Sequence, residues 1–537
     1  MTKQFQTLTE ALEKNRSEEH FVGFIEGQGQ EKAITFEALY QRALGLLYIL
    51  QQQGMQKGDY LILFLNNNEQ MVDVFWACQF GGIIPVPLAV GISDQHRQKV
   101  FNVAQKLGKT FLYTDRKNLL KLESSAQEEI AKSTYQQLAE RVLLSDDIVD
   151  ISLPGQVENI VPEDTSFIQF SSGSTGSPKG VVLKHRNLIA NIEGIQKGAA
   201  FTSADISLSW MPLTHDMGLI GFHLNPIVCN YSHFIMRTDL FVRRPLYWMT
   251  ATSEKKASVL CSPNFGYKHF LNAFKRKGLN AIDLSHVRLV FNGAEPISVS
   301  LCEQFTRELA QYGLPKHCMF AVYGLAEASL AVSFPEINAP LQVVHAQRDS
   351  LSIETVVVLN SQDDDSVSLV GVGKPIVNCK VRISDKNGNS LAENTVGHIH
   401  IRGGNVTEEI IGDDGSNFLV EGWVDTGDIG FVCKQGLFIT GRFKEILFVN
   451  GQNYYPYDLE ESLHQIPNLE LGKVVVAGVT SKQSGLEEVL VFVLYKGELE
   501  SFLSLASNLT AIVNVQFGIV VHPVITIKKV PKTTSGK

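Results

Sequence analysis

The segment Ser166–Gly180 reads SFIQFSSGSTGSPKG. Its first five residues have the composition of a buried strand, and the remainder is rich in glycine, serine and threonine. Glycine tolerates φ > 0 and close backbone approach, so such a turn can offer several N–H groups to phosphate oxygens. Hydroxyl groups add donors, and Lys179 adds a mobile cation. The segment therefore predicts a strand, a phosphate-binding loop and then a helix that begins near Asn187.

This loop is not a Walker loop, in which serine or threonine follows the lysine, because Gly180 follows Lys179. The alternative interpretation is a flexible surface loop. A cluster of hydroxyl groups, glycines and a lysine anchored directly on a strand is a poor linker and a good cradle for phosphate. We therefore favour a phosphate-binding loop.

Strand-like runs alternate with helical stretches on both sides of this segment, through the first four hundred residues. A helix is predicted over Glu69–Gly81, after the strand candidate Tyr60–Leu65. This alternation favours an α/β fold with largely parallel sheets. The other strand candidates are Tyr60–Leu65, Thr110–Thr114, Ser258–Cys261 and Val287–Phe291.

The character of the sequence changes near residue 340, where it becomes rich in strands. A hairpin is predicted at Asp385–Asn389 and a strand at His398–Arg402, and the acidic run Asp363–Asp365 is expected in a surface loop. After residue 441 the chain restarts as a small α+β unit, which predicts domains at 1–441 and 442–537. Its expected elements are a helix at Tyr457–Gln465 and strands at Lys473–Val479 and Glu488–Tyr495.

Composition excludes several classes of protein. The 537 residues are 44% hydrophobic and 19% charged, which is typical of a soluble globular protein. The net charge of −9 argues against a nucleic-acid-binding protein, which usually presents a basic face. The seven cysteines are dispersed with no CxxC pair, as expected of reduced thiols. No apolar signal peptide or run of about 18 apolar residues is present, so we expect a cytoplasmic protein outside the membrane.

Further polar groups follow strands or interrupt apolar runs. His215 lies with an aspartate in WMPLTHDMGLI, where a buried core histidine is an equally good interpretation. The segments NGAEP (Asn292–Pro296) and YGLAEA (Tyr323–Ala328) place glycine and a carboxylate where open α/β sheets bind ligands. Glu327 is a natural Mg²⁺ ligand if phosphates lie nearby.

Two segments remain near the C-terminus. Asp428 in GWVDTGD could accept hydrogen bonds from both ribose hydroxyls, and Arg442 in GRFKE could bridge ribose and phosphate. A surface salt bridge is the alternative for Arg442. The final PKTTSGK (Pro531–Lys537) taken alone would be interpreted as an untethered basic tail.

Taken together and in this order, the motifs resemble the adenylate-forming superfamily of acyl-CoA synthetases, nonribosomal-peptide adenylation domains and luciferases. The resemblance runs from about Ile34 to the last residue. It is closest to the fatty acyl-AMP ligases that load polyketide and nonribosomal-peptide assembly lines. This is shown by HDMGLIG (His215–Gly221), NGAEP, YGLAEAS (Tyr323–Ser329) and NYYPYDLE (Asn453–Glu460).

The resemblance implies a fold with a large N-terminal domain and a small, mobile C-terminal α+β domain. The large domain would hold two parallel-rich sheets sandwiched by helices and a β-barrel-like subdomain. It also implies that ATP and Mg²⁺ are required. The implied ATP-binding residues are Ser172, Ser174, Thr175, Gly176, Lys179, Gly293, Ala294, Glu295, Tyr323, Gly324, Asp428 and Arg442. The implied catalytic residues are Lys537, His215 and Glu327, with Glu327 on Mg²⁺, Lys444 at a hinge, and Phe222, Phe265 and Gly266 in an acyl pocket.

The implied activity is conversion of a fatty or arylalkyl carboxylic acid to acyl-AMP with release of pyrophosphate. The acyl group would then pass to a phosphopantetheinyl carrier protein, which could be a domain of the same, longer chain. An insertion that hinders free coenzyme A is expected at Val343–Gly373. Two departures are that the chain ends on Lys537, where family members continue, and that Glu445 and Leu447 replace more usual residues. Alternatives are a coenzyme A ligase, an adenylation domain for a 2-hydroxy, 2-oxo or amino acid, and an inactive nucleotide-binding module.

Overall fold

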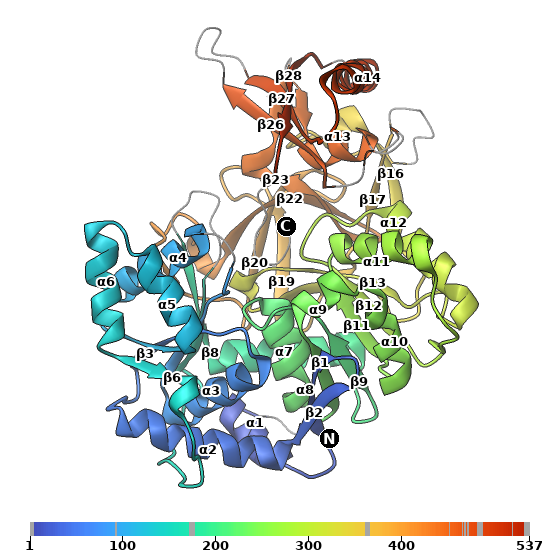
Figure 1. Cartoon of the computed structure of the whole chain (residues 1–537). Coiled ribbons are helices and arrows are strands. Elements are labelled where there is room, and N and C mark those ends of the chain that lie inside the picture. Colours follow the sequence, from blue (N-terminus) through green and yellow to red (C-terminus); the bar gives the residue numbers. More distant parts are fainter. Residues whose placement is uncertain are drawn as a thin grey trace.

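The chain is described by a computed structural model that covers residues 5–91, 94–170, 178–359, 366–449, 452–463, 466, 469, 472–480, 487–517 and 519–530. Figure 1 shows a large body, coloured blue to orange, with a smaller unit of orange and red elements at one end. Within these residues, no helix is long and apolar enough to cross a membrane.

Two sheets built mainly from parallel strands form the large body. The first has seven strands in the order β13-β12-β11-β9-β10-β1-β2, of which only β1 and β2 pair antiparallel. The second is wholly parallel in the order β4-β3-β5-β6. The bounds are β1 Phe21–Gly27, β2 Gln30–Thr35, β3 Tyr60–Phe64, β4 Ile84–Pro87, β5 Thr110–Thr114, β6 Val142–Leu144, β9 Ile206–Ser209, β10 Ser232–Met236, β11 Val259–Ser262, β12 Leu289–Asn292 and β13 Met319–Ala321. The expected parallel-rich α/β architecture is confirmed.

Helices cover these sheets, and α3 (Asn68–Gly81) shows why the sequence folds this way. The side chain of Asn67 accepts the backbone N–H of Gln70, which begins the helix, and Gly82 ends it at a φ of +60°. From Met71 to Gly81 every residue is buried, and the two polar members of this run are paired, Asp73 with Arg42 and Gln79 with Ser166. The other helices are α1 Leu8–Asn15, α2 Phe36–Gln52, α4 Asp94–Leu107, α5 Arg116–Ser125, α6 Glu129–Ala139, α7 His185–Ala199, α8 Asn225–Cys229, α9 Thr238–Arg243, α10 Leu246–Lys255, α11 Asn264–Lys277 and α12 Val299–Leu309.

Strand β3 divides the apolar interior. Leu61 and Leu63 belong to the largest cluster of buried residues, whereas Ile62 and Phe64 belong to a second cluster with residues of α4, α5 and α6. Alternate residues of a strand point to opposite faces of its sheet, so this four-stranded sheet is packed on both sides.

The predicted phosphate-binding segment differs from its expected context. It joins β7 (Thr165–Phe170) to β8 (Gly180–Lys184), and these two strands pair antiparallel. The predicted helix near Asn187 is confirmed, because α7 begins at His185, but the strand β8 between the loop and this helix was not predicted. The run GVVLK is rich in β-branched residues and can pair back onto β7 and with β21 (Ile410–Ile411), so tertiary pairing sets its structure.

Antiparallel strands fill the region after residue 320. The four-stranded sheet β19-β20-β22-β23 is flanked by the short sheet β14-β15-β18 and by the pair β16-β17. The predicted hairpin turn is confirmed, because the Asp385 N–H donates to the Asn389 carbonyl at 2.9 Å. The run Asp363–Asp365 lies outside the described residues. The bounds are β14 Tyr323–Gly324, β15 Ala331–Phe334, β16 Val343–Gln347, β17 Ser366–Val370, β18 Lys374–Pro375, β19 Cys379–Ser384, β20 Gly397–Gly403, β22 Val424–Cys433 and β23 Gly436–Arg442.

The smaller unit has an apolar core of its own. This core runs from Leu447 to Ile519 and shares no residue with the other three clusters. The sheet β26-β27-β28 carries α14 (Leu499–Phe517) and α13 (Pro456–Leu463), which confirms a small α+β unit. The domain boundary at 441/442 stays a prediction. The remaining bounds are β24 Leu447–Val449, β25 Gln452–Tyr454, β26 Val474–Thr480, β27 Glu487–Leu494 and β28 Val521–Ile527.

The two parts touch through the segment that follows β16. Arg348 forms an ion pair with Asp458 of α13, and its guanidinium lies 4.3 Å from the centre of the Phe517 ring. The Tyr455 hydroxyl donates to the Leu351 carbonyl at 2.9 Å. This contact falls within the expected insertion at Val343–Gly373, whose status as an insertion stays a prediction.

Glu460 makes the stability of the smaller unit dependent on pH. Burial raises the pKa of its carboxyl to about 7, the N–H of Val476 opposes this shift, and Glu445 adds to it. A raised pKa means that the folded state loses stability as pH rises from the unfolded value of about 4.3 through 7. Glu460→Gln should therefore raise the free energy of unfolding by about 1–3 kcal/mol at pH 8.5 and leave it unchanged at pH 4.

Urea unfolding of both proteins at the two pH values tests this expectation. Exposed Glu498→Gln, which removes the same charge from the surface, is the matched control. An equal gain in stability at both pH values would contradict the role given to Glu460.

Candidate active site

Asp428 is the centre of a buried polar group in which distant parts of the chain meet. It lies on β22, and both of its carboxylate oxygens are engaged. The Tyr323 hydroxyl donates to Oδ2 at 2.6 Å, and Arg442 Nε, from the end of β23, donates to Oδ1 at 3.0 Å. The three predicted ATP-binding residues Asp428, Arg442 and Tyr323 are thus brought together, with Gly324 next in the chain.

Burial and the neighbouring polar groups shift the pKa of Asp428 in opposite directions. Burial raises the pKa of Asp428, while Arg442 and the Tyr323 hydroxyl lower it. Asp428 in turn raises the pKa of the Arg442 guanidinium. The Arg442 side chain is 57% exposed, so it reaches from the buried carboxylate to the surface. A fixed carboxylate beside an accessible guanidinium suits a ligand that carries both hydroxyl groups and phosphate.

Glu327 lies in the short turn Ala326–Ala328 and is held at both ends. The Thr407 N–H donates to the Glu327 carbonyl at 2.8 Å. On the other side, the Ser329 hydroxyl donates to the Asn405 carbonyl at 2.8 Å, and Ser329 has a φ of +65°. A strained backbone that its surroundings hold in place is common at functional sites.

The Glu327 side chain is partly buried near other acidic groups. Burial raises its pKa, Asp428 and Asp216 raise it further, and Arg442 opposes them. No group of three or more histidine, cysteine or acidic side chains among the described residues could hold a metal ion. One partly buried carboxylate does fit Mg²⁺, which is usually bound by one or two carboxylates together with substrate phosphates.

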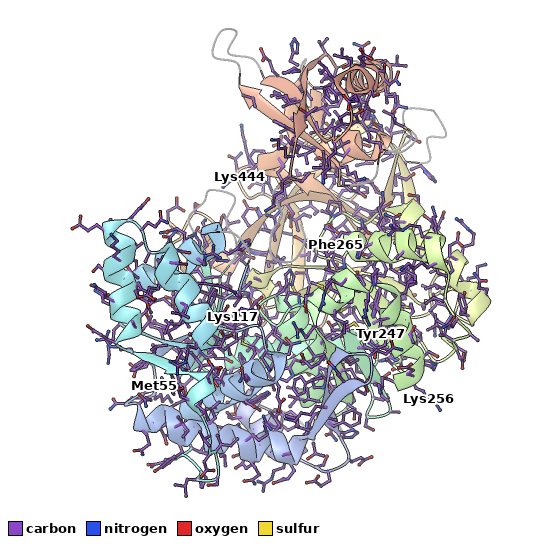
Figure 2. The ribbon with its side chains drawn as sticks, in the orientation of Figure 1. Met55, Lys117, Tyr247, Lys256, Phe265 and Lys444 are labelled. Carbon is purple, nitrogen blue, oxygen red and sulfur yellow. The ribbon has the colours of Figure 1, made fainter. Side chains whose placement is uncertain are left out.

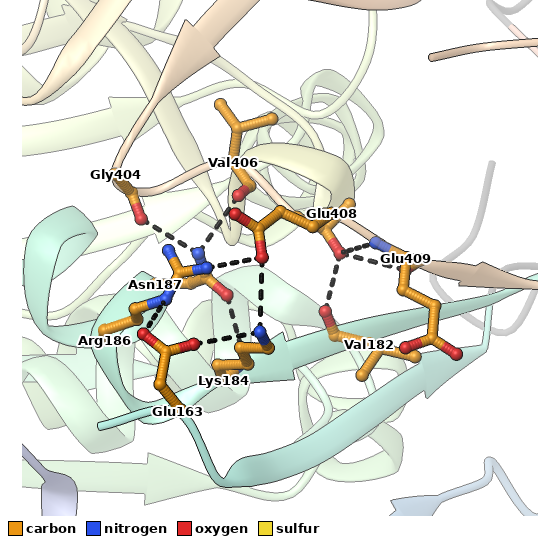
Figure 3. A network of polar contacts seen from close by, with 10 residues as sticks. Glu163, Val182, Lys184, Arg186, Asn187, Gly404, Val406, Glu408 and Glu409 are labelled. Atoms are coloured by element: carbon orange, nitrogen blue, oxygen red, sulfur yellow. Dashed lines mark hydrogen bonds and ion pairs between the residues drawn. The ribbon is translucent and has the colours of Figure 1, made fainter. Parts of the chain in front are cut away.

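A polar network fixes the segment that supports Glu327. Figure 3 shows it between β8, α7 and residues 404–409. Asn187 Nδ2 donates to the carbonyls of Gly404 and Val406 at 2.9 and 3.0 Å, and Glu408 pairs with Arg186 at 2.5 Å. Thr407 donates through its hydroxyl to the Val182 carbonyl at 2.6 Å. The strand that follows the predicted phosphate-binding loop is therefore tied to the turn that holds Glu327.

Of the predicted phosphate-binding residues, Ser172, Ser174, Thr175 and Gly176 lie outside the described residues. Lys179 is described, and its ammonium forms an ion pair with Asp413, whose side chain is only 1% exposed. Asp413 was not among the predicted site residues, because its GDDG context carries no distinctive signal. To contact a phosphate, the Lys179 ammonium would either bind the phosphate and Asp413 together or leave Asp413 for the phosphate.

The NGAEP turn follows β12 and has a constrained backbone. A side chain at Gly293 would come within 2.9 Å of Val322, and Ala294 has a φ of +70°. Glu295 Oε1 accepts the backbone N–H of Phe265 at 2.7 Å, in the first turn of α11. The predicted adenine frame is thereby connected to the predicted acyl pocket.

The predicted acyl-pocket residues divide into two places. Gly266 lies against Trp210, where a Cβ atom would be 2.4 Å from the indole ring, and the Phe265 ring meets the same indole edge-on at 5.5 Å. Phe222 packs edge-on against Phe291 at 5.9 Å. Figure 2 shows Phe265 in the large body.

His215 precedes the π-helix Met217–Leu224, an element that is frequent at functional sites. The Met217 N–H donates to His215 Nδ1 at 3.2 Å, and the same nitrogen lies 2.7 Å from Asp216. Its side chain is 17% exposed, so it is not a fully buried core histidine. It remains accessible to a ligand.

Lys444 is exposed in the short turn Phe443–Glu445, directly after Arg442. In Figure 2 it lies where the smaller unit joins the large body. Its position fits a hinge, because the connection there is one short turn. Lys537 lies outside the described residues.

Comparison with known proteins gives one consistent result. The family described as AMP-binding enzyme matches residues 8–410. A protein of Caulobacter vibrioides named a putative acyl-CoA synthetase is 30% identical, over 99% of this chain and 94% of its own. JamA of Moorena producens, named a medium-chain-fatty-acid–acyl-carrier-protein ligase, is 26% identical, over 95% of this chain and 89% of its own.

A solved structure from a study of fatty acyl-adenylate ligases of E. coli and L. pneumophila has a TM-score of 0.88 and 28% identity, over 100% of this chain and 97% of that one. The chain belongs to the AMP-binding enzyme family. It is accordingly an ATP-dependent acid ligase that activates a carboxylic acid as its adenylate.

Proposed function

We propose that this protein converts a fatty or arylalkyl acid to acyl-AMP and passes the acyl group to a phosphopantetheinyl carrier protein. The single observation that supports it best is the buried pair of Asp428 and Tyr323, bonded to the exposed Arg442, with the Glu327 carboxyl close by. Its relatives include an enzyme named for ligation to an acyl carrier protein, which supports the choice of acceptor.

In this proposal the two halves of the nucleotide are bound by different elements. Asp428 accepts hydrogen bonds from the ribose hydroxyls, and Arg442 reaches from the ribose toward phosphate. Tyr323, Gly324 and the turn of Gly293, Ala294 and Glu295 frame the adenine. Because Tyr323 donates to the Asp428 carboxylate at 2.6 Å, the tyrosine also orients the group that receives the ribose.

The reaction forms one bond and breaks one. A carboxylate oxygen of the acid attacks the α-phosphorus of ATP, and the bond to the bridging oxygen of pyrophosphate breaks. Glu327 would hold Mg²⁺, which supplies positive charge beside the phosphates when bound. Lys179 and Lys537 would offset the charge that develops on the leaving pyrophosphate. His215 would border the acid.

The acid is expected to lie against Gly266 and Phe265. Gly266 is buried against the Trp210 indole and the Ser262 hydroxyl, and the Phe265 side chain beside it is only partly buried. An apolar pocket discriminates one methylene group by only ~1–3 kcal/mol, so several chain lengths should be accepted.

Mass spectrometry of the products tests the proposal directly. The protein is mixed with Mg-ATP and a panel of fatty, arylalkyl, 2-hydroxy, 2-oxo and amino acids, with coenzyme A or a phosphopantetheinylated carrier protein. We expect acyl-AMP from apolar acids and acyl transfer to the carrier alone. Formation of acyl-CoA would identify a coenzyme A ligase, the activity named for the Caulobacter relative. No adenylate from any acid would contradict the proposal.

A hinge at Lys444 gives a separate expectation for the transfer step. Lys444→Pro removes a backbone N–H and fixes φ, so a rotation about this turn would be blocked. We expect acyl-AMP formation within about threefold of the native rate and loss of acyl transfer by at least about tenfold. Lys444→Ala, which keeps the backbone free, is the control and should support both steps. Normal transfer by the proline variant would place the hinge elsewhere.

A further inference from the structure

Lys99 lies at the base of the predicted phosphate-binding loop, on an element that no motif identified. It belongs to α4, and its ammonium donates to the carbonyl of Phe170 at 3.1 Å. Phe170 is the last residue of β7, directly before the loop. The side chain therefore reaches the end of the strand that leads into the loop.

This lysine differs from its neighbours in its partners. Lys179 pairs with Asp413, and Lys184 pairs with Glu163 and Glu408. Lys99 has its one hydrogen bond with an uncharged carbonyl, and no carboxylate within the described part of the chain pairs with it. An ammonium has three donors, so two of its N–H groups remain for a ligand.

Burial makes this arrangement costly in the absence of an anion. The Lys99 side chain is mostly buried, and desolvation lowers its pKa to about 8. A buried cation is normally paired or bound to an anion. The surroundings add positive charge, because Lys99, Lys529 and Arg97 all lower the pKa of His96, after burial itself. Lys529 follows β28, so cationic groups of the large body and the smaller unit converge here.

We propose that Lys99 is a further phosphate-binding residue, which contacts the pyrophosphate portion of ATP and the released pyrophosphate. Two phosphate groups would supply the negative charge that no carboxylate of the described residues gives to Lys99. This inference deepens the proposed function, since it assigns a residue to the leaving group of that reaction.

Binding of two ligands separates this role from a structural one. Pyrophosphate with Mg²⁺ and AMP are titrated separately by calorimetry into the full chain. Lys99→Met and Lys99→Gln should weaken pyrophosphate binding by about 10–100-fold, as loss of a charged hydrogen bond implies, and change AMP binding by less than about twofold. Lys99→Arg should retain binding within about fivefold. The control is Lys109→Met, which removes a charge from an exposed lysine near the end of the same helix.

Two results would overturn the proposal. Unchanged pyrophosphate binding in both the Met and Gln variants would show that Lys99 does not contact it. Equal weakening of AMP and pyrophosphate would show that Lys99 only supports the fold. The titrations contain no carboxylic acid substrate. Their result therefore does not depend on whether the protein activates an acid. Native protein that binds pyrophosphate but forms no adenylate would contradict the proposed function alone.

Discussion

Glu327→Gln is expected to lower the rate of acyl-AMP formation by about 10²–10³, the usual effect of removing one preorganised charged group from an active site. The amide matches the carboxylate in shape but brings no negative charge to Mg²⁺. The turn should survive, since its contacts with Thr407 and Asn405 use backbone atoms of residues 327 and 328 and the Ser329 hydroxyl. Initial rates of pyrophosphate release, measured across Mg²⁺ concentrations, test this.

The same experiment has a pH dependence with a defined sign. Burial raises the pKa of Glu327, so lowering the pH protonates the carboxyl and should increase the Mg²⁺ concentration that the native enzyme requires. The glutamine variant should lack this trend. Exposed Glu336→Gln is the control. A native rate in Glu327→Gln would remove Glu327 from the proposed metal site.

Lys537→Ala should reduce acyl-AMP formation by about 10²–10³ while leaving ATP affinity within about threefold. The reason is that a lysine brought to the leaving group stabilises the transition state more than bound ATP. Single-turnover rates and ATP titration together measure both quantities. Lys532→Ala, in the same C-terminal segment, is the matched control. Equal loss in both variants, or none in Lys537→Ala, would contradict the assigned role.

Local pattern predicted the central elements well. Strand β5 has the predicted bounds Thr110–Thr114, because all five of its residues are buried and both flanks are polar or glycine. Strand β8 was missed because it begins at the loop and runs directly into α7, with no turn residues to separate them. Its pairing with β7 and β21 is decided by residues remote in the sequence.

The predicted site residues could be named from the sequence, but their partners could not. Lys179 and Asp413 are separated by 234 positions, and Tyr323 and Asp428 by 105. No periodicity carries information over such distances. Lys99 was overlooked for a related reason, since a lysine on an ordinary amphipathic helix has no distinguishing neighbours until the fold brings it to Phe170.

The separate apolar core of the smaller unit bears on how such enzymes diversify. A unit whose interior is filled only by its own residues can be exchanged between relatives by recombination without repacking the larger body. A compatible replacement would have to keep the contacts between the two parts, which include Asp458 and Phe517 with Arg348, and Tyr455 with Leu351 and Thr440. Chimaeras that keep these pairs would show whether the smaller unit can be exchanged between relatives without loss of folding.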